Sequence, residues 1–129
     1  MSIDYSRFKF GKGVPAVVKR QERKDDDQDR QASARAEVWK RDQGRDRATG
    51  QPLSKTDLDP DCRGECAHLR GRRVMPEWKY DSCRQVLLSV ANHRLMHAGL
   101  LKVIGTDARH PLTFVRVNLK GAELWRRTR

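Results

Sequence analysis

Apolar residues in the second half of the chain fall into short runs, and each run has the length of one kind of secondary structure. Residues 64–69 and 85–90 are short apolar runs bounded by polar loops, which predicts two strands. Residues 91–98 have helical composition and precede Gly99, a residue type that commonly ends helices. The pattern therefore predicts a strand–strand–helix unit between residues 64 and 99.

Three further segments complete the expected architecture. Residues 31–43 (QASARAEVWKRDQ) are rich in helix formers and place Ala34 and Val38 on one face, which predicts a helix that stops at Gly44. The stretch that follows is rich in Gly, Pro, Asp and Thr, and predicts turns and loop. The runs LLKVIGTDA and LTFVRVNL flank residues 109–111 and predict a C-terminal β-hairpin, so the expected fold class is α+β.

Residues 1–30 combine SRFKFGKGVP with QERKDDDQDR, and we expect a basic, mixed-charge and partly disordered N-terminal arm. Its basic residues alternate with Phe8 and Phe10, which suits an arm lying on a phosphate backbone; a tail without such contacts explains the same residues. The run 25–27 is Asp-Asp-Asp, which in a mixed-charge segment is typical of a solvated face rather than of a metal site. Residues 31–129 are expected to form one domain.

Charge points to a class of partner. The chain has a net charge of +11 and a sequence pI near 10.2, and residues 61–129 carry most of the excess, with 14 basic and 6 acidic residues. Such a balance favours a polyanion, nucleic acid first and an anionic membrane surface second, while a basic protein that charge keeps in solution is the alternative. Without an apolar run near the ~18 residues of a membrane span, without a signal-like N-terminus and with three cysteines, we expect a cytoplasmic setting and no membrane.

Three histidines lie within the predicted strand–strand–helix unit. His93 and His97 share one helical face, a common way to hold a divalent metal ion. His68, in the first strand, meets them if the helix folds back across the strands. A pair at this spacing also occurs as ordinary surface decoration, and the third histidine in this order is what favours a metal site. His110 precedes a proline in a turn and is expected to be exposed and without a role.

The short sequence motifs around these histidines resemble those of the HNH endonucleases, in particular the small HNH proteins of tailed phages and prophages. The resemblance covers roughly residues 36–118 and rests on the motifs RDRATGQPL, AHLRGRR, LLSVANHRLMHAGLL and GTDARHPLTF. It implies a ββα-metal finger that hydrolyses or nicks DNA with one divalent metal ion.

The resemblance also implies a role for each histidine. His68 matches the general base that takes a proton from water, which a neutral imidazole does near pH 7. His93 matches the metal ligand on the helix, and His97 matches a further ligand that some members, such as the nuclease colicins, carry. The expected ion is Mg²⁺ or Mn²⁺, or a softer Zn²⁺ or Ni²⁺, which imidazole ligands favour. It would offset charge on the scissile phosphate.

The chain departs from the pattern at two site positions. The residue before the general base is usually an Asp or His ligand, and here it is Ala67. Glu65 lies two residues earlier on the same strand face, so it is the candidate third ligand. The place of the motif's middle asparagine holds Arg84 or Gln85. Gln85 offers a similar amide hydrogen bond beside the general base, whereas Arg84 offers a phosphate contact.

A third departure concerns structural zinc, which many phage members bind through two Cys-x-x-Cys pairs. The matching positions here hold Asp46, Thr49, Ser89 and Asn92. Having lost all four thiolates, the chain is expected to bind no structural zinc. Its cysteines do not rebuild the site and are expected to be small buried or half-exposed thiols: Cys62, Cys66 and Cys83.

Basic residues around the finger are the candidate contacts to double-stranded DNA. These are Arg70, Arg72, Arg73, Lys79 and Arg94. They are interleaved with Trp78 and Tyr80, which suits stacking, although Trp78 packing over a small core explains it equally well. Contacts to the phosphate backbone carry no base information, so weak sequence preference is expected.

The expected function is a metal-dependent DNA endonuclease or nickase, a phosphodiester hydrolase with a histidine general base. One alternative is a catalytically degenerate HNH fold that binds DNA, or serves as a phage packaging accessory, without cutting. The resemblance class makes a phage terminase a candidate partner and a bacterial host or phage-infected cell the expected setting. Another alternative is a basic structural or RNA-binding protein in which the histidines are incidental.

Overall fold

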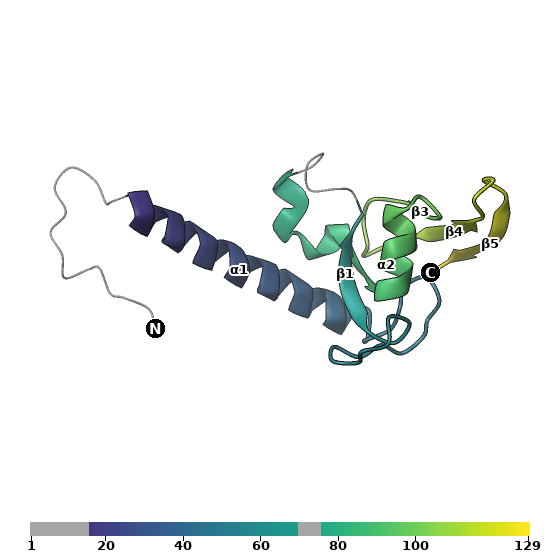
Figure 1. Cartoon of the computed structure of the whole chain (residues 1–129), viewed down its shortest axis with the longest axis horizontal. Coiled ribbons are helices and arrows are strands. Elements are labelled where there is room, and N and C mark those ends of the chain that lie inside the picture. The colour runs from purple at the N-terminus through teal and green to yellow at the C-terminus, as the bar shows by residue number, and fades with distance from the viewer. Residues whose placement is uncertain (1–15, 70–75) are drawn as a thin grey trace, which may run out of the picture.

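A computed structural model of the protein describes residues 16–69 and 76–129. Over these ranges the fold is mixed α+β, with two α-helices and two small antiparallel sheets. Helix α1 lies at one end of the molecule, the three-stranded sheet at the other, and a two-stranded hairpin with helix α2 between them (Figure 1). The predicted fold class is therefore confirmed at the level of α+β.

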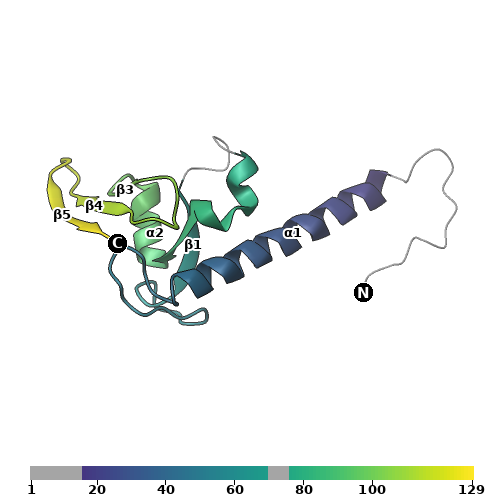
Figure 2. The same ribbon diagram turned by 180° about the vertical axis from the view of Figure 1, so that it is seen from behind.

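Helix α1 spans Ala16–Arg41, so it begins well before residue 31, where the sequence pattern predicted its start. Residues 16–30 of the expected arm are helical, and residues 1–15 lie outside the described ranges. Only the C-terminal part of α1 is buried, through the predicted Ala34 and Val38. The N-terminal part extends away from the rest of the fold (Figure 2). Its polar residues give no apolar stripe, which is why periodicity alone did not extend the helix.

Strands β1 (Gly64–His68) and β2 (Gln85–Ser89) pair antiparallel, with His68 opposite Gln85, and both confirm the predicted strands. The two faces of β1 meet different helices. The Cys66 thiol contacts the backbone of α1, whereas Glu65 contacts a histidine of α2. Because successive side chains on a strand point to opposite faces, His68 lies on the same side as Cys66.

Helix α2 spans Val90–His97 and agrees with the predicted helix to within one residue at each end. Ser89 caps it by accepting a hydrogen bond from the Asn92 N–H at 3.0 Å. Gly99 follows with φ of 76°, a conformation that costs glycine little, so it ends the helix as expected. The connection from β1 to β2, which the sequence pattern predicted as a polar loop, ends in two short 3₁₀ helices. These are η1 (Pro76–Tyr80) and η2 (Ser82–Arg84).

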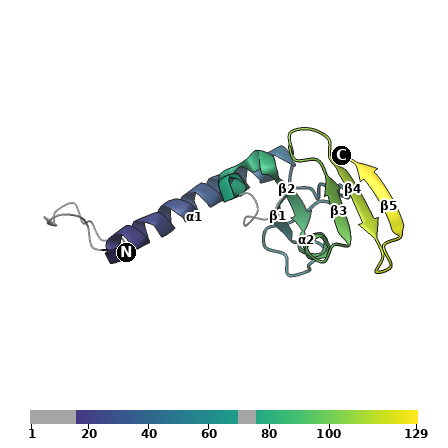
Figure 3. The same cartoon turned by 90° about the horizontal axis from the view of Figure 1, so that it is seen from above.

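The predicted C-terminal hairpin is part of a three-stranded sheet. Strands β3 (Leu101–Ile104), β4 (Thr113–Val117) and β5 (Glu123–Thr128) lie side by side beyond α2 (Figure 3). Strand β5 was not predicted because its segment is mostly charged, and Trp125 is its one half-buried residue. As the sheet edge, it needs only backbone pairing with β4 to form.

One apolar cluster joins the two sheets. It is formed by Ala48, Ala67, Val86, Leu88, Leu101, Ala108, Leu112 and Phe114. Trp39 packs so closely against Gly64 that a Cβ on Gly64 would lie 2.7 Å from the indole ring, so this contact requires glycine. Neither helix in the described ranges has the length and apolar character needed to cross a membrane.

Candidate functional site

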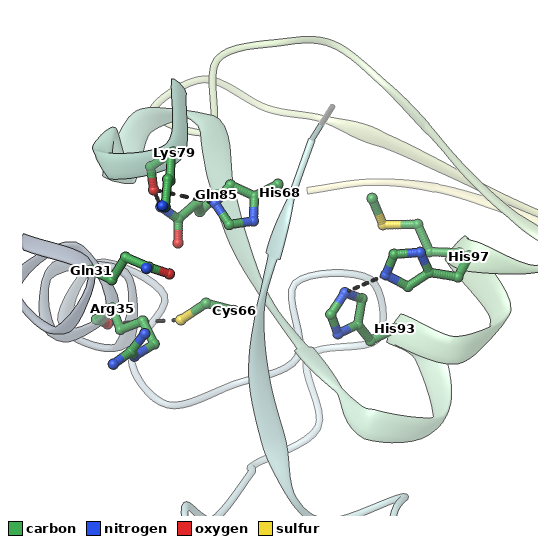
Figure 4. A pocket seen from close by; sticks show the side chains of 9 residues that line it. Gln31, Arg35, Cys66, His68, Lys79, Gln85, His93 and His97 are labelled. Carbon is green, nitrogen blue, oxygen red and sulfur yellow. Dashed lines mark hydrogen bonds between the residues drawn. The ribbon is translucent and has the colours of Figure 1, made fainter. Parts of the chain in front are cut away.

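A cavity of about 510 Å³ gathers five of the eleven predicted site residues. It is lined by Gln31, Arg35, Cys66, His68, Lys79, Gln85, His93, Met96 and His97. His68 lies on one side of β1, and the two histidines of α2 lie on the other (Figure 4). All three histidines line the cavity, but β1 lies between His68 and the other two, so their meeting around one metal ion stays a prediction.

His93 and His97 face each other through their Nε2 atoms, which are 3.1 Å apart. Their separation by one helical turn brings the ring centroids to 4.7 Å. When two imidazole nitrogens bind one cation at about 2.1 Å, they lie about 3.0–3.4 Å apart, provided that the nitrogen–metal–nitrogen angle is between a right angle and the tetrahedral angle. The pair therefore fits two neighbouring ligands of a divalent metal ion, and without an ion one ring donates a hydrogen bond to the other.

Glu65 occupies a different place from the one expected of a third ligand. Its Oε1 lies 3.3 Å from Nδ1 of His93, the ring nitrogen that does not face His97. A carboxylate on that nitrogen fixes the orientation and tautomer of a ligating imidazole. Consistent with this, residues 16–69 and 76–129 contain no group of three or more His, Cys, Asp or Glu side chains arranged to hold a metal ion. The described residues thus offer two candidate ligand atoms, Nε2 of His93 and Nε2 of His97, and Glu65 contacts the other ring nitrogen of His93.

His68 has the geometry of a base. Its Nε2 lies 3.3 Å from the carbonyl oxygen of Lys79. A carbonyl only accepts hydrogen bonds, so this contact assigns the proton to Nε2 and leaves the lone pair on Nδ1. Gln85, which is 2% exposed, donates from Nε2 to the same carbonyl at 3.3 Å and to that of Asp81 at 3.5 Å. Gln85 therefore helps to fix the carbonyl that orients His68.

Arg84, the other candidate for the asparagine position, does not line the cavity. Its guanidinium lies over the Trp78 ring, 4.3 Å from the centroid, and its Nη1 donates to the carbonyl of Thr106. These contacts join η2 to the loop between β3 and β4. The side chain is turned toward packing, and its expected phosphate or catalytic contact stays a prediction. Trp78 correspondingly packs against Arg84.

The predicted DNA contacts have different surroundings. Arg94 is exposed on α2, between the two histidines in sequence. Lys79 lines the cavity, but its Nζ forms an ion pair with Asp27 of α1. Arg70, Arg72 and Arg73 lie outside the described residues.

Asp27 anchors α1 to η1, which sequence reasoning missed because it placed the Asp run on a solvated face. Besides pairing with Lys79, Asp27 accepts a hydrogen bond from the Tyr80 hydroxyl. Lys79 and then Tyr80 lower the pKa of the Asp27 carboxyl to about 2. The guanidinium of Arg30 covers the Tyr80 ring at 3.8 Å from its centroid. This cluster fixes the segment whose carbonyl orients His68.

The four positions matched to zinc-binding cysteines converge on one carboxylate. Asp46 is 1% exposed, and its Oδ1 accepts from the backbone N–H groups of Ala48 and Thr49 at 2.7 and 3.1 Å. Its Oδ2 accepts from the N–H of Ser89 and from Nδ2 of Asn92, both at 2.8 Å. Asp46 thereby ties the loop after α1 to the first turn of α2. The sequence predicted the loss of the thiolates but not this hydrogen-bond network.

The cysteines agree with their expected description as half-buried thiols, and all three are free. Burial raises the pKa of Cys66 to about 11, so this thiol stays protonated at neutral pH although it lines the cavity. The cavity combines a pair of nitrogens suited to a cation, the imidazole of His68, and two basic side chains, Arg35 and Lys79. A scan against protein-family models and searches of curated proteins and of solved structures found no match for this chain.

Proposed function

We propose that the protein is a metal-dependent DNA endonuclease or nickase built on an HNH-type ββα-metal finger formed by β1, β2 and α2. The observation that carries the proposal is the cavity that His68 lines together with His93 and His97, whose Nε2 atoms face each other. The convergence of positions 46, 49, 89 and 92 supports the same family, because two distant Cys-x-x-Cys pairs would require that geometry.

In this proposal each side chain has one task. His93 and His97 would hold a divalent ion, which would supply positive charge to the scissile phosphate and the leaving oxygen. Glu65 keeps the His93 ring in the orientation that directs Nε2 to the ion. His68 accepts a proton on Nδ1 from the attacking water as the water oxygen bonds to phosphorus. The bond from phosphorus to the leaving sugar oxygen breaks, and that oxygen takes a proton from solvent.

The substrate we propose is double-stranded DNA, approached through its backbone. A net charge of +11 and the exposed Arg94 beside the histidines favour contacts to phosphate, which are indifferent to sequence. The resemblance to phage proteins makes a terminase the candidate protein partner and the bacterial cytoplasm the candidate setting.

A degenerate HNH fold that binds DNA without cutting is the second candidate. Ala67, at the usual ligand position, is fully buried in the apolar cluster, and the cavity supplies two nitrogen ligands rather than three. Fewer protein ligands weaken metal binding, which favours this alternative over catalysis. It predicts retention of DNA with no cleavage under any divalent ion.

A supercoiled-plasmid nicking assay separates the two candidates. Wild type, His68→Ala and His93→Ala are incubated with Mg²⁺, Mn²⁺, Ni²⁺ or Zn²⁺ and with EDTA, and His110→Ala is the control because His110 is 75% exposed. We expect metal-dependent nicking by wild type and the control, and loss of at least about a hundredfold in rate for the other two variants. Nicking by His68→Ala at the wild-type rate, or no nicking by wild type with any ion, would sink the nuclease proposal.

A further inference from the structure

We infer that Arg35 of α1 is a phosphate-binding residue of this cavity, so that α1 forms part of the site rather than a separate arm. The inference rests on the proposed function for the identity of the ligand, a DNA phosphodiester. It adds a residue outside the strand–strand–helix unit, in a helix to which the sequence assigned no part in the chemistry.

The position of Arg35 is fixed by packing around it. Its neighbour Ala34 is 3% exposed, and Val38 one turn later is fully buried, so this part of α1 is held against the body of the fold. The Cys66 thiol contacts the Arg35 carbonyl, with 3.9 Å between sulfur and oxygen. The Arg35 side chain itself is exposed and lies beside Cys66 on the cavity wall (Figure 4).

The charges around Arg35 favour an anion. Within the described residues, the side chains that line the cavity include no carboxylate. The other basic chain on the wall, Lys79, is paired with Asp27, whereas Arg35 forms no ion pair among the described residues. Burial raises the pKa of Cys66, and the positive charge of Arg35 opposes that rise, which is consistent with a guanidinium close to the cavity wall.

The chemistry of a guanidinium suits the place. Its planar set of N–H donors holds two phosphate oxygens at once, which an ammonium cannot do in the same geometry. His93 and His97 lie across β1 from Arg35 (Figure 4). A phosphodiester on the α1 side of the cavity is then bound by the Arg35 guanidinium, with His68 beside it (Figure 4).

The test compares Arg35→Ala and Arg35→Lys with Arg20→Ala. Arg20 lies on the same helix, is exposed, and is not part of the cavity wall, so its replacement removes the same charge elsewhere. Fluorescence anisotropy measures the Kd for a labelled duplex in EDTA over a series of salt concentrations, and plasmid nicking is measured with Mn²⁺. Circular dichroism checks that each variant is folded.

We expect Arg35→Ala to weaken duplex binding at least about tenfold. The slope of log Kd against the logarithm of the salt concentration should fall by the amount that about one phosphate contact contributes. Arg35→Lys should recover part of the affinity, and Arg20→Ala should stay within about threefold of wild type. If Arg35→Ala equals Arg20→Ala in both assays while wild type nicks, the inference is wrong and the nuclease proposal stands. If wild type binds but never nicks, a tenfold loss for Arg35→Ala upholds the phosphate contact while the nuclease proposal fails. A wild type that does not bind the duplex overturns both.

Discussion

The variant Asp46→Ala tests how the helix with the two histidines is held in place. The Asp46 carboxylate is almost completely buried and accepts four hydrogen bonds at 2.7–3.1 Å. The donors are the backbone N–H groups of Ala48, Thr49 and Ser89 and the side-chain amide of Asn92. One side chain thereby connects the loop after α1 to the start of α2.

Alanine removes the acceptor and leaves these donors without a partner. A buried donor that loses its partner costs about 1–3 kcal/mol, and the lower value applies where water enters the space left by the carboxylate. Four donors at about 1 kcal/mol each give a loss of about 4 kcal/mol in the free energy of unfolding. That is a large part of the total of about 5–15 kcal/mol that is usual for a domain.

Urea unfolding followed by far-UV circular dichroism measures the loss. Asp61→Ala is the matched control, because Asp61 is exposed, and its replacement should change the free energy by less than about 0.5 kcal/mol. A loss below about 1 kcal/mol for Asp46→Ala, with the control unchanged, would refute the reasoning, since the four hydrogen bonds would then contribute no more than one.

Three further predictions test the packing, the anchor of α1 and the resemblance. Gly64→Ala should lower the free energy of unfolding by about 1–3 kcal/mol in urea, because its Cβ would lie 2.7 Å from the Trp39 ring; an unchanged midpoint would contradict this packing. Asp27→Asn should be less stable than wild type at pH 7. Because the folded-state pKa of about 2 lies below the ordinary 3.8, the difference should shrink below about pH 4 and vanish only below pH 2 in thermal melts; a difference independent of pH would exclude the ion pair. A variant with cysteine at positions 46, 49, 89 and 92 should bind Co²⁺ with tetrahedral thiolate absorption, and a failure of the folded variant to do so would count against the resemblance.

Local patterns were enough to predict the elements that bury an apolar face. The strands at 64–69 and 85–90 and the helix at 91–98 have short apolar sequences with clear stops, and the structure contains all three. The elements without that signal were missed. Residues 19–30 of α1 include no apolar residue, and β5 is an edge strand whose residues are mostly exposed. Their stability comes from the helix backbone and from pairing with β4, which periodicity does not report.

The site was predictable where chemistry and spacing coincide, and not where it depends on tertiary contacts. The spacing of His93 and His97 predicted two nitrogens on one face, and these atoms do meet. The contact of Glu65 with the far nitrogen of His93 depends on the distance between β1 and α2, which the sequence does not contain. For the same reason Arg84 and Gln85 were indistinguishable in sequence, although one packs on Trp78 and the other faces the cavity.

Alternation along β1 accounts for the shape of the site and for the missing ligand at position 67. His68 lies on the face toward α1, and Ala67 faces the apolar cluster, where Val86 is its cross-strand partner. In the described part of the chain β1 pairs with β2 alone, so a cavity shared by His68 and the histidines of α2 has to pass around the free edge of β1. A carboxylate at position 67 would enter a fully buried position and would need a cation beside it at all times, because an unpaired buried charge is costly. Alanine there adds to the core instead, and in the proposed nuclease the remaining ligands of the ion would be water and the phosphate.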